Sequence, residues 1–228
     1  MKINKKNMRL AGIFLILLGI LLGVNNIYES LNAQKKSQII LNGLEDLGGV
    51  KKEVPDIEME LNYPIKTING IDIIGYIEIP KLQKKLPVAA TWDYEIMKSC
   101  PNRYKGKKYL DPLIILGHNY RSHFKDISRL DRGDEIIFTD VLGRSLYYTV
   151  DIMEIIDGND ITSMVSTDYD LTLFTCTFDR VNRVTIRAMR KWNFFFLKIN
   201  ILNKRDALSV FFNVLDTQKR TLLVGRVR

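Results

Sequence analysis

Residues 10–28 form an uninterrupted run of nineteen uncharged residues, and this run limits the possible architectures of the chain more than any other feature. At about 1.5 Å per residue, a helix of this length covers about 30 Å, which is close to the hydrocarbon thickness of a membrane. Basic residues precede the run, which favours a cytoplasmic N-terminus with the rest of the chain outside. We therefore expect residues 1–28 to be a basic segment followed by an uncleaved, single-pass transmembrane anchor.

Two other interpretations of this run are a cleaved signal peptide and a buried core helix. Cleavage needs a small-x-small site, and the nearest candidate, Leu31-Asn-Ala33, has an unfavourable leucine at its first position. The position at the very start of the chain and the basic flank argue against a core helix. An anchor agrees better with both observations.

The net charge of +8 is concentrated at the two ends of the chain. The first nine residues hold four basic side chains and no acid, and residues 190–228 hold nine basic and two acidic ones. The body between these segments therefore carries a net charge of −3. A domain that binds nucleic acid would present a basic face, whereas basic termini suit an anionic membrane. We expect membrane lipid, and no nucleic acid, as a partner.

The remainder of the chain divides into three segments. Residues 29–66 are expected to contain a short helix over 34–47, ended by Gly48 and Gly49, and then a linker. Residues 67–190 form the body. Residues 191–228 are a basic and apolar tail, whose apolar run is too short to span a bilayer and is interrupted by Lys198. No mechanism assigns a role to this tail.

Short apolar runs rich in β-branched residues dominate the body, which indicates strands rather than long helices. The intervening segments predict a helical turn at 93–98 and a short helix at 123–130. A mostly β fold with a closed or partly closed sheet follows. The predicted strands cover residues 71–79, 86–90, 113–117, 134–139, 145–156, 171–176 and 183–189.

Three reactive side chains stand at the ends of these predicted strands. Cys176 ends one apolar run, His118 follows another, and Arg183 opens the last. A thiolate can attack a carbonyl, an imidazole can move protons, and a fixed cation can stabilise an oxyanion. These parts suffice for acyl transfer through a thioester.

Each of these assignments has a competitor of the same residue type. His123 opens the predicted helix and is expected to be partly exposed or near a cap. Arg180 lies in the loop after Cys176. Arg187 shares the strand face of Arg183 about 13 Å away and is expected to face solvent or form an ion pair. Cys100 lies in a turn-like setting, and although two cysteines invite a disulfide, we interpret it as a structural thiol.

Over residues 68–190 the chain resembles the sortases, the cysteine transpeptidases of Gram-positive cell surfaces. The segment Thr172-Leu-Phe-Thr-Cys176 is similar to the family's TLxTC signature, and Leu116-Gly-His118 is similar to its histidine motif. Arg183 corresponds to the arginine that opens the last core strand. The order His, Cys, Arg and the N-terminal anchor also match. A papain-like hydrolase would have the cysteine before the histidine.

The resemblance implies an eight-stranded sortase β-barrel with a few short helices, preceded by the transmembrane helix. It implies that Cys176 attacks the Thr–Gly bond of an LPxTG-like sorting signal, that His118 is the acid and base, and that Arg183 stabilises the oxyanion. The acceptor would be an amine of a peptidoglycan precursor or a pilin lysine. No cofactor or metal is expected. Thr175 and Asn119, beside Cys176 and His118, are candidates for orienting the substrate.

The class within the family is expected to be A, D or E-like. The connector of residues 157–170 is short for class B, which has a long helix there, and no acidic-aromatic lid motif of class C precedes the body. The acids Asp157, Asp160, Asp168 and Asp170 have no calcium-site spacing and are interpreted as solvated loop charges. The alternative to an enzyme is a catalytically silent, sortase-like barrel that binds cell-wall polymer or a partner protein.

Overall fold

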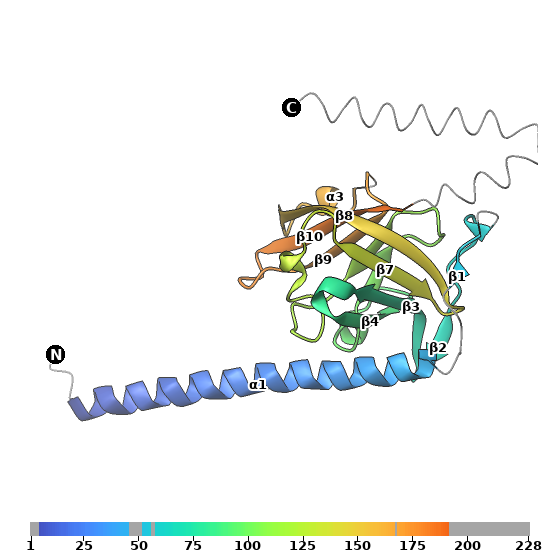
Figure 1. The fold of residues 1–228 in the computed structure, drawn as a ribbon. Helices are drawn as coiled ribbons and strands as arrows, with labels where there is room; N and C mark the ends of the chain where they lie inside the picture. Colours follow the sequence, from blue (N-terminus) through green and yellow to red (C-terminus); the bar gives the residue numbers. More distant parts are fainter. Residues whose placement is uncertain (1–4, 46–51, 56–57, 167, 192–228) are drawn as a thin grey trace, which may run out of the picture. The chain divides into compact units, whose positions relative to one another are not determined.

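The computed structural model describes residues 5–45, 52–55, 58–166 and 168–191, which combine one long helix with a β-barrel (Figure 1). Short helical elements connect some of the strands: α2 (Tyr94–Met97), α3 (Ile161–Met164) and the 3-10 turns η2 (Pro80–Leu82) and η3 (Ile127–Arg129). The long helix is α1 (Lys5–Glu45). The strands are β1 (Lys52–Glu53), β2 (Lys66–Ile68), β3 (Ile71–Ile79), β4 (Lys84–Ala89), β5 (Asn102–Lys105), β6 (Leu113–Leu116), β7 (Glu135–Asp140), β8 (Arg144–Asp157), β9 (Leu171–Cys176) and β10 (Asn182–Arg190).

Eight of these strands close into a barrel. The sheet runs β8-β10-β9-β6-β5-β4-β3, and β7 pairs with both β3 and β8, so the two ends of the sheet meet. β6 and β9 run parallel, and β9 and β10 run antiparallel. Closure leaves no unpaired edge in this ring. The expected mostly β, eight-stranded barrel with few helices is confirmed.

The strands that the sequence predicted are present within one or two residues of their expected bounds. The hairpin between β7 and β8 and the helical turn α2 are confirmed as well. β1, β2 and β5 were not predicted, because strands of two to four residues that contain charged side chains leave no clear alternation. The expected helix at 123–130 is wrong: only η3 forms, and Phe124, Ile127 and Leu130 all enter the barrel core instead of one helix face.

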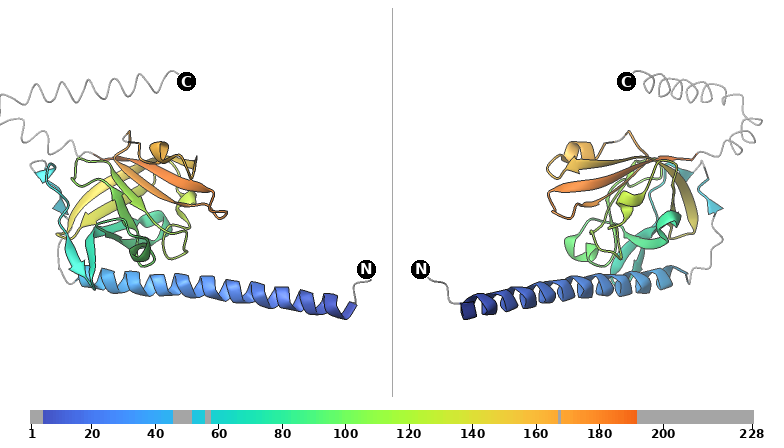
Figure 2. Two further views of the ribbon diagram at one scale, coloured as in Figure 1. Left: turned by 180° about the vertical axis from the view of Figure 1, so that it is seen from behind. Right: turned by 60° about the vertical axis from the view of Figure 1, so that its left-hand side comes forward.

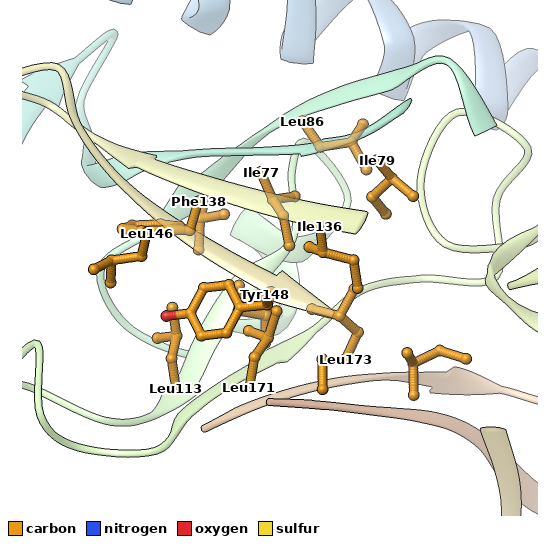
Figure 3. Close-up of a cluster of buried hydrophobic side chains, with 14 of the residues drawn as sticks. Ile77, Ile79, Leu86, Leu113, Ile136, Phe138, Leu146, Tyr148, Leu171 and Leu173 are labelled. Atoms are coloured by element: carbon orange, nitrogen blue, oxygen red, sulfur yellow. The ribbon is translucent and has the colours of Figure 1, made fainter. Parts of the chain in front are cut away.

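The barrel interior is filled by one cluster of aliphatic and aromatic side chains (Figure 3). Alternate residues of each strand enter it, as the two-residue period of a strand requires. On β9, Leu171 and Leu173 are fully buried in this cluster, as are Leu113 and Ile115 on β6. The tightly packed interior fixes the register of β6, β9 and β10, whose ends carry the candidate site.

The helix α1 is continuous from Lys5 to Glu45, so the separate helix expected at 34–47 is its C-terminal part. That part packs on the barrel through Ile40, Leu41 and Leu44, while the apolar N-terminal part extends beyond the barrel (Figures 1 and 2). The helix is long and apolar enough to cross a membrane, and the barrel does not cover its most apolar window. The sequence pattern missed the continuity because polar residues follow the apolar run.

Residues expected to be a linker are partly built into the barrel. Met59 and Tyr63 are buried in its core, and β2 pairs with β3. Apolar side chains therefore hold this stretch against the body rather than spacing it from α1. The tail expected at 191–228 lies outside the described residues except for Lys191, as do Lys2 and the Gly48–Gly49 helix end.

Candidate active site

The strand register places Cys176, His118 and Arg183 side by side. Cys176 ends β9, and its direct partner across the antiparallel pair with β10 is Arg183. On the other side of β9, Leu116 of β6 is level with Phe174, and the Gly117 amide donates to the Phe174 carbonyl oxygen at 3.1 Å. Two residues further along each chain, His118 is therefore level with Cys176. Three neighbouring strand ends therefore carry the cysteine, the histidine and the arginine at one level of the sheet.

These side chains belong to the outer face of the barrel. Phe174 of β9 packs with Ile114, Ile156 and Met164 in a cluster separate from the interior. Cys176 is two residues from Phe174, so it shares this outer face, and directly paired residues point to the same side. Cys176 is partly exposed there. A substrate can reach the sulfur from outside while apolar side chains form the surface next to it.

The ring of His118 lies between two tyrosines. Tyr120 stacks on it with ring centroids 4.7 Å apart and an interplanar angle of 29°, and Tyr94 approaches edge-on at 5.6 Å and 83°. The Nε2 atom of His118 is buried and has no hydrogen-bond partner among the described residues. Burial lowers the pKa of His118, and the positive charges of Lys98 and Arg180 add to this, while Glu29 opposes it. The imidazole is thus neutral near pH 7 and can accept a proton.

Gly117 sets the position of His118. A Cβ atom at Gly117 would lie 2.6 Å from the ring of Phe124, which is fully buried in the core. Real Cβ atoms do not approach another atom this closely, and the buried ring cannot move away. Only glycine lets the chain pass over Phe124 at this point, so Gly117 in the Leu116-Gly-His118 motif has a steric function.

A second close approach positions Arg183. A Cβ atom at Gly158 would lie 2.3 Å from the Val181 carbonyl oxygen and 3.0 Å from a guanidinium nitrogen of Arg183. The guanidinium itself donates to the carbonyl oxygens of Asn182 and Arg180, at 3.0 and 3.3 Å. The glycine after β8 therefore allows the β8–β9 connector to lie against Arg183.

The loop between β9 and β10 is a closed hydrogen-bonded turn. The Thr177 amide donates to the Asn182 carbonyl oxygen at 2.9 Å, and the Asn182 amide donates to the Thr177 hydroxyl at 3.1 Å. Asp179 accepts from the Thr177 hydroxyl and from the Val181 amide. Arg180 is exposed in this turn, with φ at +63°. These bonds fix the loop that carries Arg180 and leads into Arg183: Arg183 is paired with Cys176 in the strand register, and Arg180 is exposed, although its charge still acts on His118.

The competitor Arg187 was expected to face solvent or to form an ion pair; it is buried, and it forms the ion pair. Its guanidinium pairs with Glu154 at 2.8 Å and donates to the Met164 carbonyl and the Thr172 hydroxyl, both at 3.0 Å, and to the Ser163 carbonyl. These contacts fasten α3, in the β8–β9 connector, to the outer face of β9 and β10. The guanidinium of Arg187 therefore has a structural role, because these contacts use its N–H donors.

His123 differs from its expected position. It is fully buried rather than partly exposed, since the chain of residues 120–126 turns inward at the barrel end. Burial, with the neighbouring His118 contributing, lowers its pKa to about 3. A side chain without access to solvent cannot meet a substrate.

The two candidates for substrate orientation lie in different environments. Thr175 alternates with Cys176 and Phe174, so it points to the barrel interior, where its side chain is buried and its hydroxyl has no partner among the described residues. It does not share the face of Cys176. Asn119 is partly exposed and lines a groove next to His118.

The two cysteines are both free, so the disulfide that their number allows is absent. Cys100 is completely buried, and burial raises its pKa to about 12. Such a thiol is unreactive at neutral pH. The interpretation of Cys100 as a structural thiol agrees with this environment.

The acidic side chains of the β8–β9 connector are occupied with local backbone contacts. Asp157 accepts from the Asn159 amide at 2.8 Å, Asp160 caps α3 at the Ser163 amide, and Asp170 accepts from the Arg190 amide. Within the described ranges, no three His, Cys, Asp or Glu side chains gather closely enough to hold a metal ion.

Sequence reasoning missed three residues of the site, Tyr120, Tyr94 and Gly158. Tyr120 follows His118 by two residues, a spacing that could have indicated contact. Tyr94 and Gly158 come from distant segments and carry no local signal. Arg187 was identified only by its strand face, and its burial depends on α3.

Comparison with known proteins gives the family. The Sortase domain family matches residues 77–191, just over half of the chain. Sortase C1 from Streptococcus agalactiae has 23% identical residues and a TM-score of 0.50, covering 74% of this chain and 91% of its own. Clostridium perfringens sortase C with the C-terminal cell wall sorting motif has 21% identity, a TM-score of 0.47 and the same coverages. Sortase A from Listeria monocytogenes has 20% identity, a TM-score of 0.48, and coverages of 53% and 88%.

No curated protein is significantly similar to this chain in sequence. The structures of Streptococcus agalactiae sortase C1, at a TM-score of 0.50, are of a class C enzyme, so the expected class A, D or E-like assignment is not confirmed. The similarity to sortase C1 shows the fold, and the family match covers the strands that carry Cys176, His118 and Arg183. The chain belongs to the sortase family of transpeptidases.

Proposed function

We propose that this protein is a membrane-anchored cysteine transpeptidase in which Cys176, His118 and Arg183 act together. The observation that carries the proposal is their common level at the ends of β6, β9 and β10. The substrate is a protein with an LPxTG-like sorting signal. The Cys176 sulfur attacks the carbonyl carbon of the Thr–Gly bond, which breaks as a thioester forms.

His118 transfers the protons in both half-reactions, as a general base and a general acid. It takes the thiol proton and gives it to the departing amine of the glycine. When an acceptor amine attacks the thioester, His118 takes a proton from that amine and returns one to the Cys176 sulfur. The lowered pKa of His118 supports its role as the base, since a neutral imidazole is available near pH 7.

Arg183 stabilises the negative charge that develops on the carbonyl oxygen. Its guanidinium is held by two backbone carbonyl oxygens and by the close passage of Gly158. An oriented cation that need not rearrange during the reaction is the efficient arrangement for an oxyanion. Asn119, on the rim beside His118, is placed to contact the substrate or the acceptor.

The anchor places the enzyme at the cell surface. The apolar part of α1 crosses the membrane with its basic N-terminus in the cytoplasm, so the barrel is extracellular. The acceptor there is an amine of a peptidoglycan precursor, or a pilin lysine. The one-turn helix α3 in the β8–β9 connector supports a class other than B, and the absence of a class C lid motif in the sequence still favours an A, D or E-like enzyme.

Intact-mass spectrometry of the full chain in detergent tests the mechanism. The chain is mixed with LPxTG-like peptides, with and without an added amine, beside Cys176→Ala and Cys100→Ala. We expect an adduct of the peptide's N-terminal half on Cys176 that the amine discharges. The Cys100→Ala protein should behave as the wild type. A thiol that reacts with reagents but forms no adduct with any peptide would instead indicate a binding module.

A further inference from the structure

A groove of about 1020 Å³ separates α1 from the segment that follows His118. One wall is the helix surface from Asn26 to Leu41, and the other consists of η2, the start of β4 and residues 119–129. Asn119 and Tyr120 line it, so the groove begins directly beside the candidate catalytic histidine. It is distinct from the outer face that carries Cys176.

The barrel wall of this groove is strongly basic. Five lysine and arginine residues line it against one acid, Asp126, although the body of the chain is acidic overall. Asp126 pairs with Lys84 at 3.5 Å. Arg121, Lys125 and Arg129 are exposed, and none of the three side chains forms an ion pair within the described part of the chain.

The position of the groove along α1 fixes its depth relative to a membrane. Its first helix residues, Asn26 and Ile27, are among the last of the uncharged run 10–28, which covers about the thickness of the hydrocarbon. The helix wall of the groove continues to Leu41, about 20 Å along the helix axis beyond Tyr28. The polar layer of a bilayer extends roughly 5–7 Å beyond the hydrocarbon on each side. The groove therefore begins at the edge of the hydrocarbon and passes through the level of the lipid headgroups.

From this position and charge, we propose that the groove binds anionic phospholipid headgroups of the leaflet in which α1 is anchored. Arg121, Lys125 and Arg129 supply the charge, and arginine in particular matches phosphate with paired N–H donors. The proposal rests on the membrane anchoring proposed above and adds a second contact. Docking would hold Tyr120, and with it His118, at a fixed height above the membrane surface.

Hydrogen exchange of the full chain in nanodiscs tests this contact. One set of nanodiscs contains phosphatidylcholine alone, and the other contains phosphatidylcholine mixed with phosphatidylglycerol. We expect backbone amides of residues 119–129 to exchange several-fold more slowly in the anionic discs. Molar salt should remove the difference, because the Debye length falls to about 3 Å at 1 M.

Two triple variants with the same change in net charge sharpen the test. Arg121→Gln, Lys125→Gln and Arg129→Gln together should abolish the lipid-dependent protection. Lys105→Gln, Lys107→Gln and Arg132→Gln, three exposed residues that do not line the groove, should leave it intact. Retained protection in the first variant, or equal loss in both, would overturn the proposal.

Other outcomes separate this proposal from the proposed function. Equal exchange in both disc compositions would overturn headgroup binding even if the same sample forms the Cys176 thioester. Protection with no thioester would support headgroup binding and contradict the catalytic role. A chain that does not co-elute with nanodiscs of either composition would overturn the anchoring and the headgroup contact together.

Discussion

Tyr120 stacks on the imidazole of His118 with 4.7 Å between the ring centroids, and its hydroxyl approaches Glu29 of α1 at 3.4 Å. The candidate base is thus connected through one aromatic ring to the long N-terminal helix α1. Tyr120 lies in the loop after β6, and the stacking restricts the orientation of the imidazole. It also contributes to the burial that lowers the pKa of His118.

Replacing Tyr120 should therefore change the behaviour of His118 rather than the fold. We expect Tyr120→Leu to lower kcat roughly tenfold, since an aromatic pair contributes about 0.5–1.5 kcal/mol. With less shielding from solvent, the pKa of His118 should also rise toward its ordinary value, which moves the acidic limb of the pH–rate profile to higher pH. The measurement is transpeptidation rate against pH.

Tyr120→Phe is the matched control for this prediction. It keeps the ring and removes only the hydroxyl near Glu29, so the pH profile should remain that of the wild type. A loss of rate in Tyr120→Leu without any shift of the profile would show that the ring has a merely structural role.

The two cysteines should react very differently in the native protein. Cys176 is partly exposed, whereas Cys100 is fully buried with a pKa of about 12. We expect a small thiol reagent at neutral pH to label Cys176 alone, and Cys100 only after denaturation. Peptide mass mapping measures this. Labelling of Cys100 at a comparable rate under native conditions would contradict the packing around it.

Substitutions of Arg183 and Arg187, both on β10, should distinguish an effect on catalysis from an effect on stability. Arg183→Lys keeps the charge but not the planar fork, so we expect kcat to fall on the order of a hundredfold with little change in the free energy of unfolding. Arg180→Lys, in the exposed part of the same loop, is the control and should be nearly silent. Near-normal turnover of Arg183→Lys would show that another group stabilises the oxyanion.

Arg187→Met should mainly lower the stability of the fold, with a smaller effect on kcat. It leaves Glu154 and the carbonyl oxygens of Ser163 and Met164 without their donor, and we expect a loss of about 2–3 kcal/mol in the free energy of unfolding. Because α3 is fastened to the sheet by this contact, KM should rise more than kcat falls. Denaturant titration and steady-state kinetics on the same variant test both statements.

The strands and the reactive residues at their ends could be predicted because their signals are local. Short apolar runs rich in β-branched residues marked β6, β9 and β10, and His118, Cys176 and Arg183 stand at the ends of these runs. The surroundings of the site could not be predicted in this way. Tyr94 reaches His118 from α2 through tertiary packing alone, and the burial of His123 depends on how the chain turns into the barrel end.

Long-range contacts also explain the errors at the N-terminus. Met59 and Tyr63 were assigned to a linker because Gly48, Gly49 and Pro55 indicate irregular structure there, yet both enter the core. The C-terminal part of α1 looked like a separate helix, but the Ser37 hydroxyl donates to the Ser99 carbonyl oxygen at 2.6 Å and fixes it on the barrel. Neither contact has a signature in the local sequence.

The burial of His123 predicts how the stability of the protein depends on pH. Its pKa is about 3 in the folded state, against about 6.5 for an ordinary histidine in the unfolded chain. Between these values the unfolded state binds the proton and the folded state does not, so the free energy of unfolding decreases as the pH falls from about 6.5 toward 3. The loss from this residue is on the order of 4 kcal/mol at the acidic end of the window.

His123→Leu should remove most of this dependence, because leucine fills the buried site without a titratable group. His118→Ala is the control: it removes the other histidine whose pKa is lowered, but that side chain is less buried, and most of the slope should remain. Urea titrations at several pH values measure both slopes. If His123→Leu kept the full slope of the wild type between about pH 6.5 and 4, the prediction would be wrong. Carboxylates whose pKa values are lowered by their hydrogen bonds, such as Asp160 and Asp179, affect the stability only below about pH 4.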